Sequence, residues 1–95
     1  MEILGTKTFV IEPDPTMQAF KVCEEAFELF QAAKHRNDTN EYITADRRRW
    51  DMIDECADVI QAALNFFDAI GLTEEEVLDA MDECYSRNRF RGRVE

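Results

Sequence analysis

Residues 24–29 read EEAFEL and residues 54–59 read DECADV, and the rest of the chain is organised around these two acidic stretches. Each stretch contains two acids three residues apart, which are neighbours on one face of a helix. The pairs are Glu25 with Glu28, and Glu55 with Asp58. If both stretches are helical and pack together, four mutually repelling carboxylates converge. Such a cluster is tolerated when water solvates it or when a multivalent cation binds it.

Both acidic stretches lie within longer segments whose apolar residues recur with the period of a helix. Asp14 and Pro15 are typical of an N-cap and a first helical position, so we expect the first helix to run from there to about Arg36. Thr44 is the best N-cap for a second helix that continues to Ile70. On a wheel of about 100° per residue, the apolar residues cover about half of each circumference, with the acid pair at the edge of that arc.

A third helix should begin after Thr73, because Thr73-Glu74-Glu75-Glu76 has the pattern of a capping box. It should reach about Asn88 and face the core with five residues. These are Val77, Leu78, Met81, Cys84 and Tyr85. The chain contains one short β-favouring stretch, Thr8-Phe9-Val10-Ile11. We interpret residues 1–13, which include it, as an extended arm. The last residues, 89–95, read as a basic tail.

These segments predict one domain spanning residues 1–95. Its expected fold is all-α, an antiparallel helical bundle with a short extended N-terminal arm. The apolar arcs are wider than three helices of one chain can cover, so we expect the bundle to be oligomeric.

The composition narrows the class of protein. The chain has 95 residues and a formal net charge of −10, which argues against nonspecific nucleic-acid binding and against attachment to anionic membranes. No apolar run approaches the roughly 20 residues of a membrane span. Three dispersed cysteines without a CxxC pair favour a reducing cytoplasm, and their apolar helical positions predict that they lie in the core.

The acid pairs suit a hard cation better than a transition metal. Mg²⁺ prefers oxygen ligands and is commonly held by carboxylates together with substrate phosphates. A di-iron site on paired helices would need Glu-x-x-His, whereas no Glu stands three residues before His35, the single histidine. The sequence therefore favours a magnesium site, with Mn²⁺ as the substitute ion.

The order ExxE, spacer, ExxD on the long helices of a small chain resembles the MazG-like all-α nucleoside triphosphate pyrophosphohydrolases. Glu25-x-x-Glu28 and Glu55-x-x-Asp58 match the two halves of that motif, and Asn88-Arg89-Phe90-Arg91-Gly92 resembles the Asn-x-x-Arg-Gly ending. The resemblance implies hydrolysis of a ribo- or deoxynucleoside triphosphate to the monophosphate and pyrophosphate. It also implies Mg²⁺ held by the four acids, and a homodimer or homotetramer.

Several residues have expected roles in such a reaction. Glu28 is the best candidate for a general base, although its role as a ligand is equally compatible with the sequence. The other candidates contact the substrate: two arginines bind phosphate, Asn88 belongs to the same tail motif, and an amide and an indole meet the base or sugar. These residues are Arg87, Arg91, Asn88, Asn65 and Trp50.

Two other hypotheses about the function remain compatible with the sequence. A small acidic interaction protein, such as a DNA mimic without catalytic activity, would also carry a charge of −10. A sister enzyme that cleaves phosphoribosyl-ATP or a dUTP-like substrate would share the acidic motif. The residues do not select the base or the sugar.

Overall fold

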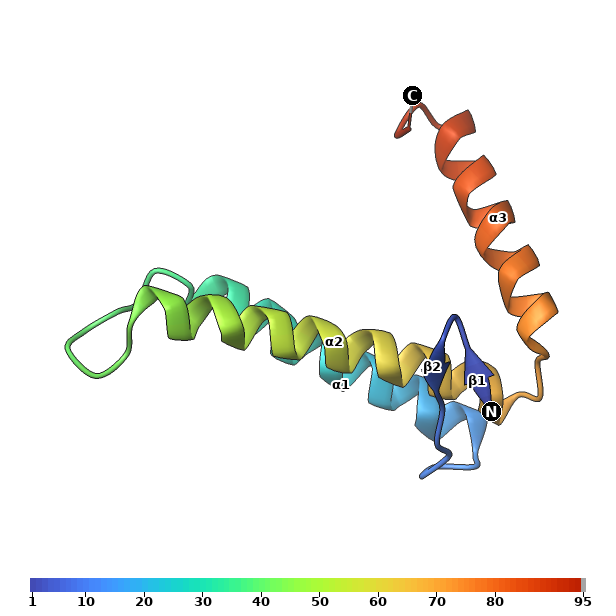
Figure 1. The fold of residues 1–95 in the computed structure, drawn as a ribbon, viewed down its shortest axis with the longest axis horizontal. Helices are drawn as coiled ribbons and strands as arrows, with labels where there is room; N and C mark the ends of the chain where they lie inside the picture. Colours follow the sequence, from blue (N-terminus) through green and yellow to red (C-terminus); the bar gives the residue numbers. More distant parts are fainter. Residues whose placement is uncertain (95) are drawn as a thin grey trace.

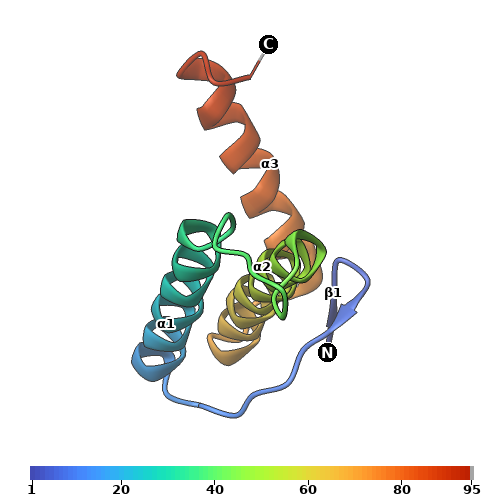
Figure 2. The ribbon, with the colours of Figure 1, turned by 90° about the vertical axis from the view of Figure 1, so that its left-hand side faces the viewer.

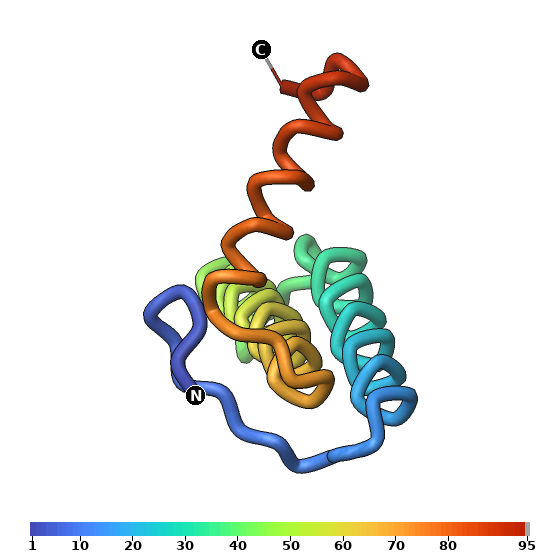
Figure 3. Tube along the Cα trace, turned by 90° about the vertical axis from the view of Figure 1, so that its right-hand side faces the viewer, coloured from blue at the N-terminus to red at the C-terminus, as the bar shows by residue number. Residues whose placement is uncertain are grey.

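The computed structural model describes residues 1–94, which form a small hairpin followed by three helices (Figure 1). The elements are β1 (Glu2–Ile3), β2 (Thr6–Lys7), α1 (Pro15–Lys34), α2 (Ala45–Ala69) and α3 (Glu74–Phe90). α1 and α2 lie side by side and antiparallel, whereas α3 leaves the pair at a steep angle (Figures 1 and 3). The expectation of a mostly helical chain is confirmed. No helix within residues 1–94 combines the length and apolar character needed to cross a membrane.

The first two helices begin where their capping residues predict. Asp14 Oδ1 accepts a hydrogen bond from the backbone N–H of Thr16 at 3.1 Å, and Thr44 Oγ1 accepts one from Arg47 at 3.1 Å. α1 ends at Lys34, two residues before the expected end. The guanidinium of Arg36 donates to the carbonyl of Ala33 at 2.8 Å, which caps the last turn in place of a further helical residue.

The link between α2 and α3 is short. Local hydrogen bonds cap the end of α2 and the start of α3. Gly71 has φ 79°, and the N–H of Leu72 donates to the carbonyl of Phe67 at 3.1 Å, as in a Schellman ending. Thr73 Oγ1 then accepts from the N–H of Glu76 at 3.2 Å, while Glu76 Oε1 accepts from the N–H of Thr73 at 3.1 Å. The predicted capping box is therefore confirmed.

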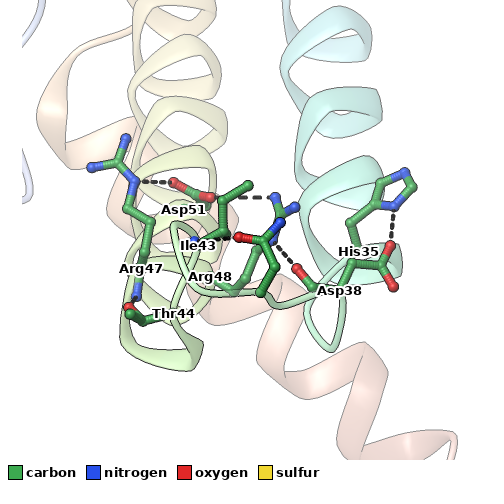
Figure 4. A network of polar contacts seen from close by, with 8 residues as sticks. His35, Asp38, Ile43, Thr44, Arg47, Arg48 and Asp51 are labelled. Atoms are coloured by element: carbon green, nitrogen blue, oxygen red, sulfur yellow. Dashed lines mark hydrogen bonds and ion pairs between the residues drawn. The ribbon is translucent and has the colours of Figure 1, made fainter.

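A network of polar contacts joins α1 to α2 at the far end of the pair (Figure 4). Asp38 Oδ2 lies 2.7 Å from His35 Nδ1, and Arg48 Nε donates to the carbonyl of Asp38 at 2.9 Å. The hydrogen bond with His35 holds the pKa of Asp38 below its usual range. Within α2, Asp51 pairs with Arg47 at 3.2 Å and with Arg48 at 3.7 Å, so Arg48 contacts both its own helix and the chain after α1.

The N-terminal arm has its strands earlier than the β-favouring text suggested. Leu4 and Gly5 have φ values of 54° and 76°, a two-residue turn that places Ile3 opposite Thr6. Residues 8–10 form no strand. The N–H of Thr8 donates to Met1, and that of Phe9 to a side chain of α2. The expected extended arm therefore contains a hairpin that the sequence did not predict, since Leu is an unusual residue for a turn with positive φ.

The core lies where the hairpin, the end of α2 and the start of α3 meet. Ile3, Leu64 and Val77 are buried there, and Phe67 and Leu72 pack against them. Most of α3 lies beyond this core. Three of the five residues expected to face inward on α3, and two of the three cysteines, are exposed, so those expectations were wrong for the single chain. The exposed residues are Leu78, Met81, Tyr85, Cys23 and Cys56.

Candidate metal and nucleotide site

Three of the four motif acids converge between α1 and α2. One carboxylate oxygen from each of Glu25, Glu28 and Glu55 lies within 4.8 Å of the others. Glu25 and Glu28 are one helical turn apart on α1, and Glu55 faces them from α2 because the two helices run antiparallel. Asp58, one turn after Glu55, lines a cavity beside this group together with Glu25.

The carboxylates are partly removed from water. Glu25 Oε2 and Glu55 Oε2 are both buried, and neither has a hydrogen-bond partner among the described residues. Burial, and then the neighbouring charge and hydrogen bond of Glu28, raise the pKa of Glu55 above its ordinary value of 4.5; Asp58 and Glu25 add to this effect. Buried carboxylate oxygens without a donor are costly unless a cation completes them, so this donor set fits Mg²⁺.

One cation of the chain itself reaches the group. Lys21 Nζ lies 3.4 Å from Glu25 Oε1, and the side chain of Glu25 is only 14% exposed. The four-residue spacing of Lys21 and Glu25 is the usual signal for such an ion pair on a helix. Lys21 neutralises one oxygen of Glu25 and leaves the other without a partner.

A cavity of about 440 Å³ opens beside the acids. The N-terminal arm contributes apolar side chains, α1 contributes an apolar side chain and charged side chains, and α2 contributes amides and Asp58. The lining residues are Phe9, Ile11, Glu12, Met17, Gln18, Lys21, Glu24, Glu25, Asp58, Gln61, Ala62 and Asn65. Figure 2 shows how the arm reaches this place, since it runs from the hairpin beside α2 to the start of α1.

Two buried amides form the polar part of the wall. Gln18 is 3% exposed, and its Nε2 donates to the carbonyl of Ala62 at 3.1 Å. Asn65 is 5% exposed, and its Oδ1 accepts from the N–H of Phe9 at 3.0 Å and from Gln61 Nε2 at 3.0 Å. Asn65, which was expected to meet the base or sugar of a substrate, therefore lines the same cavity as Asp58.

The remaining candidates do not line the cavity. Trp50 is half exposed, at 48%, in the first part of α2. Arg87 and Asn88 lie in the last turns of α3, and Arg91 is its C-cap. Asn88 Nδ2 donates to the carbonyl of Cys84 at 2.8 Å, and Oδ1 accepts from Arg93 at 3.1 Å. Because α3 leaves the helix pair, these residues and the acids lie apart within one chain (Figure 1).

The sequence did not predict that the N-terminal arm and Gln18 line the cavity. Phe9 and Ile11 read as strand residues, and nothing in their pattern places them against α1 and α2. Gln18 lies seven residues before Glu25, about two helical turns, so its side of α1 could have been inferred from the period. Its burial depends on α2.

Comparison with known proteins gave no match: no family model, no curated protein and no solved structure is similar to this chain.

Proposed function

We propose that the chain hydrolyses a nucleoside triphosphate to the monophosphate and pyrophosphate in a reaction that requires Mg²⁺ or Mn²⁺. The observation that carries this proposal is the pair of buried, unpartnered oxygens of Glu25 and Glu55 beside Glu28. With Asp58 these residues are the proposed ligands. The order ExxE then ExxD, which resembles the MazG-like enzymes, supports the same assignment.

The four acids divide into two kinds by their exposure. Glu25 and Glu55 are half-buried and suited to hold a cation, whereas Glu28 and Asp58 are exposed. Glu28 is therefore the proposed general base, which takes a proton from a water molecule. The water oxygen forms a bond to phosphorus, the bond between the α- and β-phosphates breaks, and pyrophosphate leaves. The bound metal supplies charge neutralisation and a more acidic water.

The cavity supports a nucleotide as the substrate. Its volume lies within the range of roughly 300–1,000 Å³ that is usual for small-molecule sites. Its lining includes the apolar side chains of Phe9 and Met17 and the acids Glu25 and Asp58, so it offers contacts for a base and for a metal-bound phosphate chain.

A homodimer or homotetramer is part of the proposal. Four hydrophobic residues are buried within residues 1–94, whereas large apolar side chains on all three helices are exposed. A second copy would cover such faces. Arg87, Asn88 and Arg91 are proposed to bind phosphate of a site on a neighbouring copy. The cytoplasm is the proposed location, in keeping with three free cysteines.

The acidic interaction protein is the less favoured function. A DNA mimic presents its charges to a partner and gains nothing from burying carboxylate oxygens. Here the acids of two helices converge and are partly desolvated.

The deciding experiment is hydrolysis of a panel of ribo- and deoxynucleoside triphosphates with MgCl₂ and with EDTA. Wild type should release pyrophosphate only with the metal. Glu28→Gln and Asp58→Asn should each lower kcat by roughly a hundredfold or more, the usual contribution of a general base or of a charge at the reacting group. Both variants should keep the helical signal of wild type.

Asp79→Asn is the matched control, because Asp79 is an exposed acid on α3. It should retain full activity. Full activity of both Glu28→Gln and Asp58→Asn would contradict the site, and no hydrolysis of any triphosphate by wild type would contradict the function.

A further inference from the structure

We propose that residues 7–9 of the N-terminal arm set the base selectivity of this site by holding the Asn65 amide with its Nδ2 available to a base in the cavity. The substrate class that follows is a nucleotide with a keto base, such as uracil or guanine. This inference rests on the proposed function and assigns the arm a role in it.

The arm determines which way the Asn65 amide is turned. A backbone N–H can only donate, so the atom of Asn65 that meets the N–H of Phe9 at 3.0 Å must be the oxygen. A second constraint comes through Gln61. The carbonyl of Lys7 can only accept, so Gln61 Nε2 donates to it at 3.1 Å and also to Asn65 Oδ1 at 3.0 Å. Both amides are thus oriented by arm backbone groups that cannot exchange their roles.

The consequence is a donor that makes no hydrogen bond to the described residues. Asn65 is 5% exposed and lines the cavity, and both hydrogen bonds of the described residues go to its Oδ1. Its Nδ2 is not among the fully buried atoms that lack a partner, so it is left to donate to water or to a ligand in the cavity. A ligand atom that accepts a hydrogen bond is favoured at this point.

Gln18 offers a hydrogen-bond acceptor, whereas Asn65 offers a donor. Its Nε2 is used on the carbonyl of Ala62, which leaves Oε1 to accept from a ligand. Uracil and guanine carry an exocyclic oxygen next to a ring N–H, so they can accept from Asn65 and donate to Gln18. Cytosine and adenine carry an amino group in place of that oxygen, which meets the Asn65 donor unfavourably. The apolar side chains of Phe9 and Met17 line the same cavity and can contact the faces of the ring.

The arm is anchored well enough to act as a fixed wall. Ile3 of the hairpin is fully buried in the core, and Thr8 Oγ1 donates to the carboxylate of Asp68 on α2. These two anchors stand on either side of Lys7 and keep the backbone groups that contact Gln61 and Asn65 in place. A rigid second layer of this kind is what selectivity by a single amide requires.

The test compares kcat/KM for UTP with CTP, and for GTP with ATP, in wild type and Asn65→Asp. The aspartate keeps an oxygen for the N–H of Phe9 but replaces the donor with an acceptor. Wild type should favour the keto member of each pair by roughly tenfold or more, as one buried hydrogen bond is worth about that factor. Asn65→Asp should abolish or reverse both preferences. Its added charge acts on all four triphosphates alike, so the ratios remain informative.

Asn40→Asp is the matched control. Asn40 Oδ1 also accepts from two backbone N–H groups, those of Tyr42 at 2.7 Å and Ile43 at 2.9 Å, but in the loop between α1 and α2. This variant should keep the wild-type ratios. A wild type without keto preference, or an Asn65→Asp enzyme with unchanged ratios, would overturn the inference while leaving the hydrolysis itself established.

A binding experiment separates the inference from the proposed function and uses only wild type. In EDTA, uridine and cytidine are titrated into ¹⁵N-labelled protein, and the Phe9 amide and Asn65 side-chain signals are followed. Uridine should shift both signals at concentrations at least severalfold lower than cytidine. This result would support the inference even if no triphosphate were hydrolysed. Equal response to both nucleosides, or shifts confined to other residues, would contradict it.

Discussion

Burial and neighbouring acids disfavour the charged form of Glu55. Its Oε2 is buried without a donor, and it faces Glu28 from the opposite helix, while Lys21 pairs with Glu25 instead. Replacing Glu25 would also remove the ion pair with Lys21. Glu55→Gln is therefore the cleaner variant for testing what the cluster costs the folded protein.

The raised pKa of Glu55 predicts a pH dependence of stability without metal. When the pKa of a carboxyl is higher in the folded than in the unfolded protein, folding is more favourable at a pH where the carboxyl is protonated than at neutral pH, where it is charged. That contribution is fully present below the ordinary value of 4.5 and is lost as the pH rises through the raised folded pKa. In EDTA, Glu55→Gln should therefore melt above wild type at pH 7, and the difference should shrink toward pH 4.5. A constant difference across thermal melts in this range would contradict the raised pKa.

Mg²⁺ should reverse the order of the two melting temperatures, so that wild type melts above Glu55→Gln. A ligand that binds only the folded state at a hundredfold excess over its Kd stabilises it by about 2.7 kcal/mol, which for a domain of this size raises Tm by roughly 10 °C or more. Wild type should show this shift in MgCl₂ and a much smaller one in NaCl of equal ionic strength, because screening acts weakly on a clustered site. Glu55→Gln should show little Mg²⁺-specific shift. Equal responses of wild type to both salts would argue for a solvated acidic surface.

Among the elements, α3 depends most for its stability on the hydrogen bonds that cap its two ends. Val77 anchors its first turn in the core, but Leu78, Met81 and Tyr85 are about half exposed, so packing within the chain contributes little beyond that turn. Its capping box and a second Schellman ending stabilise it locally. At that ending Gly92 has φ 74°, and the N–H of Arg93 donates to the carbonyl of Asn88 at 2.9 Å.

Thr73→Ala should lower the free energy of unfolding by about 1 kcal/mol, because the Oγ1 that accepts from the N–H of Glu76 in the first turn of the helix is lost. Urea unfolding at one fixed protein concentration measures this. Thr16→Ala is the control, since the N–H of Thr16, not its side chain, takes part in the cap of α1. It should change stability by less than about 0.5 kcal/mol. Equal loss in both variants would show that the capping box contributes nothing specific.

The molecule exposes large apolar side chains on all three helices. Phe20, Phe27 and Phe30 on α1 are each more than half exposed, and the rings of Phe27 and Phe30 lie 6.4 Å apart. The chain extends over 47 × 38 × 23 Å because α3 projects from the pair (Figure 3). Both features indicate faces that another copy would cover.

Sedimentation at micromolar concentration should therefore show a dimer or tetramer. Phe27→Asp should shift the distribution toward monomer, because a charge placed in an apolar interface has no partner there. Tyr42→Asp, the same kind of change in the loop between α1 and α2, should leave it unchanged. A wild type that sediments as a monomer would contradict the assembly.

Features that depend on neighbouring residues could be predicted from the sequence. The caps at Asp14, Thr44 and Thr73 each involve hydrogen bonds to residues two or three positions away, so residue type and spacing suffice to place them. The acid pairs lie one turn apart for the same reason. Their convergence followed from a further assumption, that the two longest helices pack as antiparallel neighbours.

Features that depend on distant contacts required the tertiary structure. Phe9 reaches Asn65 across 56 positions, and no local pattern marks either residue as a partner of the other. The direction of α3 and the exposure of its apolar side chains depend on how the α2–α3 link meets the hairpin. The cavity exists because the arm, α1 and α2 enclose it together, and the burial that raises the pKa of Glu55 is a property of that packing, which residue spacing along one helix does not contain.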